Sequence, residues 1–177
     1  MVYGAGPVRE MGMEKKWLIV CYSLSNGNTR RIAREMQQVT GGDLAELQTV
    51  EPYTGTYEEI VEQGKREVDR GYCPALQPLE ADLEKYGVIA VGTPTWWYTM
   101  APAVRTFLTG HTWTGKTVVP FQTHGGWPGH TLSDMKKACP GAHFPQEKAV
   151  RFDSSGGAEL VTPQAELDAW LASLKEI

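Results

Sequence analysis

Two short stretches of the chain are apolar at almost every position, and they constrain its fold more than any other feature. They are the runs Trp17–Tyr22 and Tyr86–Val91. A strand with one face in solvent alternates apolar and polar side chains, whereas a strand inside a parallel sheet is buried on both faces. The two runs therefore predict central strands of a parallel sheet.

Other strand and helix patterns alternate with these two runs. Further strands are predicted at 44–50, 116–123 and 149–152, and apolar residues recur at helical spacing at 32–39, 57–68, 102–108, 132–139 and 167–177. Strands that alternate with helices form βαβ units with right-handed crossovers. The prediction is one α/β domain, a doubly wound three-layer α/β/α sandwich around a five-stranded parallel sheet.

The two ends of the chain carry signals of their own. Residues 1–14 contain glycines, a proline and charges but no apolar stretch, so we expect a disordered tail rather than a signal peptide, and a domain spanning 15–177. At the other end, Thr162 is predicted to cap the last helix, with Pro163 as the first helical residue.

Composition narrows the functional classes. The formal net charge is −4, with 17 Lys and Arg against 21 Asp and Glu, whereas binding to nucleic acids or anionic membranes needs clustered cations. The three cysteines are odd in number and no two have C-x-x-C spacing, which favours a reducing compartment over a disulfide framework. We therefore expect a cytoplasmic protein that binds neither nucleic acid nor membrane.

The loop after the first strand is rich in hydrogen-bond donors. It holds three hydroxyls, two side-chain amides and one glycine, in the order Ser23, Leu24, Ser25, Asn26, Gly27, Asn28, Thr29. Ligands of open α/β sheets bind beyond the carboxyl ends of the strands, and hydroxyls with free N–H groups at a helix N-terminus form a phosphate site. The same residue types also form ordinary helix caps. Because five side-chain donors exceed the needs of a cap, we predict phosphate binding.

Two later loops are predicted to reach the same edge of the sheet. The first is the segment Pro94, Thr95, Trp96, Trp97, Tyr98, and the second is Thr123, His124, Gly125, Gly126, Trp127. Three consecutive aromatic rings cannot all enter a core, so we interpret them as one side of a site for a flat ligand; the alternative is that they cap the core. The glycines permit close backbone approach to a ligand, although the second loop alone is equally compatible with a plain connector.

Two other motifs lack the context that their chemistry requires. Gly110–Thr117 matches the pattern G-x-x-x-x-G-K-[ST], but a nucleotide phosphate loop follows a strand and precedes a helix, and here the order is reversed. The histidines and Cys139 do not have the spacings of known zinc sites. We therefore predict neither nucleotide hydrolysis nor a metal site.

At its three polar and aromatic loops the sequence resembles the flavodoxin-like flavoproteins, and the resemblance extends over residues 17–177. The run Tyr22–Thr29 is similar to the family's phosphate loop, and Pro94–Trp97 looks like its strand-3 flavin loop. Trp113–Lys116, the loop 123–129 and Cys139–Ala142 follow in the family's order. No long insertion interrupts the last strand, so the chain resembles the short-chain flavodoxins.

This resemblance implies a flavodoxin-like fold with strand order 2-1-3-4-5 and non-covalent FMN as cofactor. Residues 23 and 25–29 would hold the phosphate, residues 95–97 would pack along the isoalloxazine, and residues 123–126 would face its pyrimidine or N5 edge.

The resemblance also implies an electron carrier that works with redox partner proteins. The alternatives are an NAD(P)H-dependent reductase of a quinone or other flat acceptor, and a flavin-free interaction module. Electron-carrier flavodoxins usually have a glycine in the strand-3 loop, where a peptide flips towards the reduced flavin, and residues 94–102 contain none. No catalytic residue is assigned.

Overall fold

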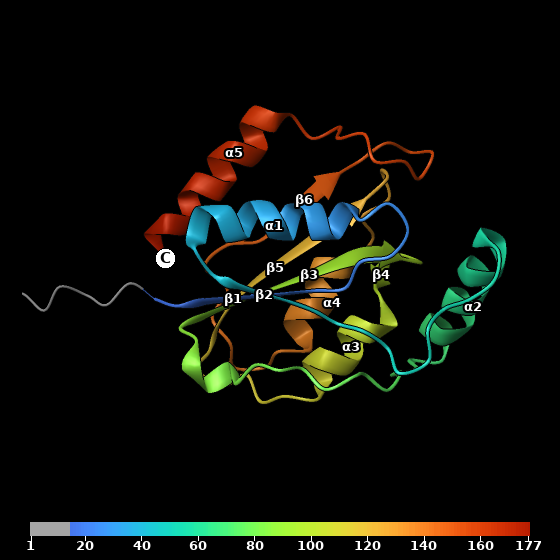
Figure 1. Cartoon of the computed structure of the whole chain (residues 1–177), viewed down its shortest axis with the longest axis horizontal. Coiled ribbons are helices and arrows are strands. Elements are labelled where there is room, and N and C mark those ends of the chain that lie inside the picture. Colours follow the sequence, from blue (N-terminus) through green and yellow to red (C-terminus); the bar gives the residue numbers. More distant parts are fainter. Residues whose placement is uncertain (1–14) are drawn as a thin grey trace, which may run out of the picture.

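A central parallel sheet carries helices on both of its faces (Figure 1). The computed structural model describes residues 15–177, and the tail predicted at 1–14 lies outside them. The strands are β1 Trp17–Cys21, β2 Asp43–Glu46, β3 Val88–Trp96, β4 Thr99–Met100, β5 Thr117–His124 and β6 Lys148–Arg151. The helices are α1 Asn28–Thr40, α2 Tyr57–Asp69, α3 Pro102–Thr109, α4 Thr131–Lys137 and α5 Gln164–Ser173, with short 3₁₀ turns at Leu83–Lys85 and Leu174–Glu176.

The parallel strands follow the order β2-β1-β3-β5-β6, which confirms the predicted three-layer fold and its order of five parallel strands. Alternate residues of each central strand enter different cores. Ile19 packs in the core beneath α1 and α5, whereas Leu18 and Val20 pack in the core beneath α3 and α4. The strands are buried on both faces, and this explains why the sequence shows continuous apolar runs there.

A sixth strand extends the sheet beyond the prediction. β4 pairs with the end of β3 in antiparallel fashion, with Thr95 opposite Met100 and Trp96 opposite Thr99. Trp97 and Tyr98 are the two central residues of this hairpin, and both have positive φ, 50° and 67°. Positive φ at both positions is the requirement of a type I′ turn, which usually selects Asn-Gly or a similar pair. Trp-Tyr is not such a pair, so the turn could not be predicted from its residues.

Helix α2 lies at one side of the domain, away from the two helical layers (Figure 1). It begins at a complete capping box, in which Thr56 Oγ1 accepts from the Glu59 N–H and the Glu59 carboxylate accepts from the Thr56 N–H. Gly64 and Glu67 are its buried residues, while Tyr57 is 67% exposed. The helix is thus well formed locally but contacts the domain over a narrow face.

The predicted cap of the last helix is wrong. Helix α5 begins at Gln164, so Pro163 occupies the N-cap position instead of the first helical position. Thr162 Oγ1 accepts a hydrogen bond from the Arg151 N–H at 2.7 Å and so ties β6 to the segment before the helix. The Thr162 hydroxyl, which we predicted would cap the helix, therefore bonds the backbone of β6 instead.

Candidate functional site

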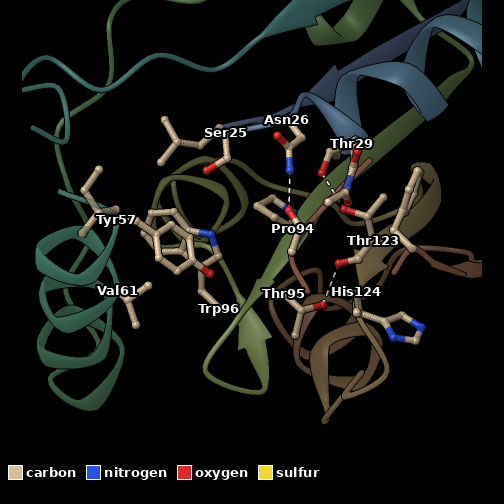
Figure 2. Close-up of a pocket in the computed structure, with 18 of the residues that line it drawn as sticks. Ser25, Asn26, Thr29, Tyr57, Val61, Pro94, Thr95, Trp96, Thr123 and His124 are labelled. Carbon is tan, nitrogen blue, oxygen red and sulfur yellow. Dashed lines mark hydrogen bonds between the residues drawn. The ribbon is translucent and has the colours of Figure 1, made fainter. Parts of the chain in front are cut away.

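A cavity of about 340 Å³ lies at the carboxyl ends of β1, β3 and β5, and we call it the main cavity. In Figure 2, Ser25, Asn26 and Thr29 lie along one side, Thr95, Thr123 and His124 along another, and Tyr57 and Val61 of α2 opposite them. Its lining residues are Leu24, Ser25, Asn26, Asn28, Thr29, Tyr57, Ile60, Val61, Gly64, Pro94, Thr95, Trp96, Trp97, Thr123, His124, Gly125, Phe152, Asp153, Gly156 and Gly157.

The loop after β1 leads into the N-terminus of α1, whose first N–H groups are only partly bonded. Gly27 is the N-cap residue with φ 71°, and it makes no side-chain cap hydrogen bond. Ser23 Oγ accepts from the Arg30 N–H at 3.3 Å, and no partner within residues 15–177 accepts from the N–H groups of Asn28 or Thr29. Free N–H groups at a helix start, where the helix dipole is positive, favour an anion. Ser23 therefore satisfies one N–H group of the first turn, and the N–H groups of Asn28 and Thr29 are left facing the loop without a partner among the described residues.

A second loop, between β6 and α5, closes over the loop after β1. Asn26 Nδ2 donates to the Gly156 carbonyl, and Asn28 Nδ2 donates to the Gly157 carbonyl at 3.0 Å. Asp153 organises this second loop, because its carboxylate accepts from the Ser155 hydroxyl and from the N–H groups of residues 155, 157 and 159. These bonds, that of the Ser155 hydroxyl first, lower the pKa of Asp153 to about 2.

A buried hydrogen-bond network fixes the floor of the main cavity. The hydroxyls of Thr29 and Thr123 lie 2.8 Å apart and are almost fully buried. Thr95 Oγ1 donates to the Thr123 carbonyl at 2.9 Å and accepts from Gln122 Nε2 at 2.9 Å. Three separate segments, from α1, β3 and β5, are therefore held in one rigid arrangement.

Trp96 is held edge-on by aromatic neighbours. Its ring centroid lies 5.9 Å from that of Tyr22 and 5.1 Å from that of Tyr53, both at nearly perpendicular angles. On α2, a methyl group at Gly64 would lie 3.1 Å from the Trp96 ring. Burial, together with the carboxylate of Glu67, raises the pKa of both Tyr22 and Tyr53, so both phenols stay neutral. The indole is thus a fixed flat surface at the cavity.

The tip of the β3–β4 hairpin, Trp97 and Tyr98, is anchored from outside. Trp97 Nε1 donates to the Val61 carbonyl of α2 at 2.9 Å, and the His130 N–H donates to the Tyr98 carbonyl at 2.8 Å. A methyl group at Gly129 would lie 2.2 Å from the Tyr98 carbonyl oxygen, so the two backbones are in direct contact. The tip therefore bridges α2 and the loop before α4.

A smaller hollow of about 210 Å³ lies beside the main cavity, and we call it the aromatic hollow. It is lined by Thr95, Trp97, Tyr98, His124, Gly125 and Trp127. The Gly126 N–H donates to His124 Nδ1 at 3.0 Å, so a neutral His124 carries its proton on Nε2. Burial and the nearby Arg151 guanidinium lower the pKa of His124 below its usual value, which favours this neutral form.

The structure brings most of the predicted site residues together. Twelve line the main cavity, namely Leu24, Ser25, Asn26, Asn28, Thr29, Pro94, Thr95, Trp96, Trp97, Thr123, His124 and Gly125. Tyr98 and Trp127 line the aromatic hollow instead. Ser23, Gly27 and Gly126 line neither, and they act through backbone geometry and the hydrogen bonds described above.

Sequence reasoning missed two contributors to the main cavity. One is the face of α2 formed by Tyr57, Ile60, Val61 and Gly64, whose helical periodicity was visible but whose destination was not. The other is the β6–α5 loop with Asp153, Gly156 and Gly157. Its paired glycines were the one available signal.

The remaining sequence motifs lie away from this site. Trp113, in the motif Gly110–Thr117, is buried and donates from Nε1 to the Leu108 carbonyl, and Lys116 Nζ lies 2.6 Å from the Glu84 carboxylate. Within residues 15–177, no group of three histidine, cysteine or acidic side chains could hold a metal ion. Among the described helices, none has the length and apolarity needed to cross a membrane.

Comparison with known proteins gives matches over nearly the whole chain. The sequence model of the family described as Flavodoxin matches residues 16–168. No curated protein sequence matches.

Solved structures of flavoproteins have a similar fold. One from Bacteroides eggerthii is 27% identical, with a TM-score of 0.73, and the match covers 92% of this chain and 99% of that one. A flavoprotein from Bacteroides uniformis is 22% identical, covers 90% and 99%, and has a TM-score of 0.73. A flavoprotein from Lactobacillus acidophilus, solved in complex with FMN, is 21% identical, covers 88% and 98%, and has a TM-score of 0.67.

Proposed function

The chain belongs to the flavodoxin family, and on this premise we propose that it is a redox flavoprotein that binds FMN non-covalently in the main cavity. One observation carries the proposal. The unpartnered N–H groups of Asn28 and Thr29 lie at the same cavity as the fixed flat ring of Trp96. An anion site next to an aromatic surface suits a ligand that has a phosphate at one end and a flat ring at the other.

The residues of the main cavity divide between these two ends. The hydroxyls and amides of residues 25, 26, 28 and 29 would hold the phosphate together with the α1 N-terminus, and Ser23 and Gly27 would set the shape of the loop. Thr95, Trp96 and Trp97 would pack along the ring, and residues 123–125 would face its polar edge. Bound FMN would supply the electron-transfer chemistry, while helix α2 would shield the ring from water through Ile60 and Val61.

We propose electron transfer in the cytoplasm as the role, with redox proteins as partners. Family membership supports the carrier role, and three cysteines without disulfides support a reducing compartment. The hairpin tip favours a second candidate, an NAD(P)H-dependent reductase. As stated above, an electron carrier of this family flips a peptide in this loop towards the reduced flavin. Trp97 and Tyr98 already have positive φ and are anchored on both sides, so such a flip would break contacts to α2 and to the loop before α4. This cost counts against the carrier role.

Titration of the purified protein with FMN tests the cofactor assignment. We expect quenching of flavin fluorescence on binding, and a loss of roughly 100-fold in affinity for the double variant Ser25→Ala/Thr29→Ala, since each hydroxyl would bond a charged phosphate. Ser133→Ala, an exposed serine of α4, is the matched control and should bind as the wild type does. A protein that does not bind FMN, or a double variant with unchanged affinity, would contradict the assignment.

Two measurements on the FMN-loaded protein separate the two roles. Anaerobic photoreduction of a carrier should accumulate a one-electron-reduced flavin with long-wavelength absorption. A reductase should instead oxidise NAD(P)H in the presence of a quinone, at a rate that depends on the quinone concentration.

A further inference from the structure

Helix α2 belongs to a loop whose two ends are joined to each other at the edge of the domain. Thr49 and Leu76 form an isolated antiparallel bridge, and beside it the Val50 N–H donates to the Ala75 carbonyl at 2.9 Å. The chain therefore leaves the domain and returns to it at one place. We call residues 51–73, which lie beyond this bridge and carry α2, the α2 segment. A compact loop closed at its base in this way can move as one body.

The two connectors of α2 within this segment have few constraints. Residues 51–56 and 70–73 are exposed, with the exception of the half-buried Tyr53. Each connector contains a glycine with positive φ, Gly55 at 109° before the helix and Gly71 at 61° after it. Exposed connectors that contain glycine can absorb changes of φ and ψ at little cost. The α2 segment therefore has a possible hinge at each end of its helix, above a bonded base.

Helix α2 is docked on the domain by few interactions. Within residues 15–177, one hydrogen bond joins α2 to a residue outside the α2 segment, from Trp97 Nε1 to the Val61 carbonyl at 2.9 Å. Next to this bond, Gly64 packs against the Trp96 ring. In Figure 1 the helix stands apart from the helical layers on both faces of the sheet. Elements with few buried contacts open more readily than the rest of a structure.

A buried carboxylate weakens the docked position of α2. Glu67 is 3% exposed and lies three residues after Gly64, on the same face of the helix. Its Oε1 accepts from the Tyr53 hydroxyl at 2.7 Å, whereas its Oε2 is buried and has no hydrogen-bond partner among the described residues. A buried carboxylate oxygen without a partner has lost its hydration and gained no bond in exchange. Undocking would return Glu67 to water, so this side chain favours the undocked position.

We propose that the α2 segment is a lid over the main cavity, which undocks from Trp96 to admit FMN and which bound FMN holds closed. The inference rests on the proposed FMN site. In the closed position Ile60, Val61 and Gly64 line the main cavity beside Trp96, and Figure 2 shows Val61 facing the cavity across from the loops. A ring that lies along Trp96 then contacts the lid in its closed position. A ligand that makes contacts in one position of a two-state element shifts the equilibrium towards that position.

Limited proteolysis of the FMN-free protein with trypsin tests the lid without its ligand. A helix of 13 residues is marginal when it is undocked, so trypsin should cut after the exposed Lys65 and Arg66 of α2 whenever the lid opens. Helix α1 is the matched control, because it also has 13 residues, lies in a helical layer and carries the exposed Arg34. Mass spectrometry of the fragments should show cleavage in α2 that is roughly tenfold or more faster than cleavage after Arg34, since the rate follows the population of the open form.

Two substitutions should move the lid in opposite directions. Trp97→Phe removes the bond to Val61 and should speed cleavage of α2 roughly fivefold, the value of one hydrogen bond. Glu67→Gln removes the buried charge but keeps the acceptor for the Tyr53 hydroxyl, and it should slow cleavage of α2 roughly fivefold. The matched controls are Trp127→Phe and Glu62→Gln, which make the same changes at exposed residues and should leave the rate as in the wild type.

The kinetics of FMN binding test whether the lid controls the cavity. Glu67 does not line the main cavity, so Glu67→Gln should act through the lid. If FMN enters and leaves while the lid is open, this variant lowers the association and the dissociation rate constants by the same factor, roughly fivefold, and Kd changes little. A side chain that acts on the bound ligand directly would change Kd instead. Stopped-flow quenching of flavin fluorescence measures both rate constants, with Glu62→Gln as the control.

Three results would overturn the inference. The first is cleavage of α2 that is no faster than cleavage after Arg34, and the second is a rate of α2 cleavage that Glu67→Gln does not change. The third is an FMN association rate constant that is the same for Glu67→Gln and the wild type. Failure of FMN itself to bind would instead contradict the proposed function. The proteolysis of the FMN-free protein would still decide whether α2 undocks, so the two failures are distinguishable.

Discussion

The loop after β1 and the tip of the β3–β4 hairpin make the same backbone demand with different residues. Each turns the chain through the left-handed region, with Gly27 at φ 71° in the first and Trp97 and Tyr98 at φ 50° and 67° in the second. Glycine adopts this conformation without a steric penalty, whereas a residue with a side chain is strained by about 1–2 kcal/mol. In the first loop the strain is therefore confined to Ser25, at φ 58°, whereas the second has two adjacent strained residues at its tip and must be held in place by its surroundings.

Three hydrogen bonds from neighbouring elements hold the hairpin tip in place. The tip is held by the bond from Trp97 to Val61, by the bond from His130 to Tyr98, and by the Thr99 hydroxyl, which donates to the Asp134 carboxylate at 2.6 Å. Each such bond contributes about 0.5–1.5 kcal/mol, so together they offset the strain of the two residues. A loop that depends on its neighbours in this way should be sensitive to changes in those neighbours.

Gly129→Ala should have the largest effect. Its methyl group would lie 2.2 Å from the Tyr98 carbonyl oxygen, at a residue with φ 58°, so we expect the free energy of unfolding to fall by about 3 kcal/mol from overlap and backbone strain together. Gly71→Ala is the matched control, because Gly71 has φ 61° and no atom within 4 Å of the added methyl group.

The control isolates the cost of backbone strain, which should be about 1 kcal/mol. Urea unfolding of both variants measures the difference. Similar losses for Gly129→Ala and Gly71→Ala would show that contact with Tyr98 does not hold the hairpin tip.

A pair of smaller substitutions should change stability in opposite directions. Gly27→Ala places a side chain at φ 71° and should lower the free energy of unfolding by about 1 kcal/mol. Tyr98→Gly removes the strain at φ 67° from a half-exposed residue and should raise it by about 0.5–1 kcal/mol, because the greater freedom of glycine in the unfolded chain offsets part of the gain.

Thermal unfolding of the two proteins without FMN measures these shifts, which correspond to roughly 2–4 °C per kcal/mol for a chain of this size. Two shifts of the same sign would contradict the contrast between the unstrained Gly27 and the strained Tyr98.

The difference between the two turns also explains which parts of the structure could be predicted from the sequence. The sheet could be predicted because strands that are buried on both faces have continuous apolar runs in their sequence. The loop after β1 could be predicted because its hydroxyls, amides and glycine suit the binding of an anion. The hairpin could not be, since Trp-Tyr is a poor sequence for its turn, and contacts with distant residues such as Val61 and His130 hold it in place.

The other omissions also depend on distant partners. Helix α2 had a clear periodicity, but its place beside Trp96 depends on a packing contact at Gly64 that no local pattern encodes. The loop that contains Gly156 and Gly157 meets Asn26 and Asn28 across 130 and 129 residues of sequence. Thr162 has the right type for a helix cap, but it is bonded to Arg151 instead.

The smallest expected effect is a loss of stability in acid, and it concerns a carboxylate that supports each of the two regions. Asp153 organises the loop that closes on Asn26 and Asn28, and its hydrogen bonds lower its pKa to about 2. The pKa of an unperturbed aspartate is about 3.9, so the unfolded chain binds the proton more readily than the folded one. This carboxylate therefore stabilises the fold at pH values above about 4, and its contribution is lost as the pH falls from about 4 through 2.

Asp153→Asn tests this sign, with Asp168→Asn as the matched control, an exposed aspartate of α5 that accepts from Gln164. Urea unfolding at pH 7, 4 and 2.5 should show a stability deficit of Asp153→Asn relative to the wild type that is full at pH 7 and shrinks towards pH 2.5. The Asp134 carboxylate supports the hairpin tip. Burial opposes its ionisation, but bonds from Thr99 and His130 outweigh burial and lower its pKa, so Asp134→Asn should show the same sign. A deficit of Asp153→Asn that does not change with pH would mean that the charge of this carboxylate does not hold the loop over the main cavity.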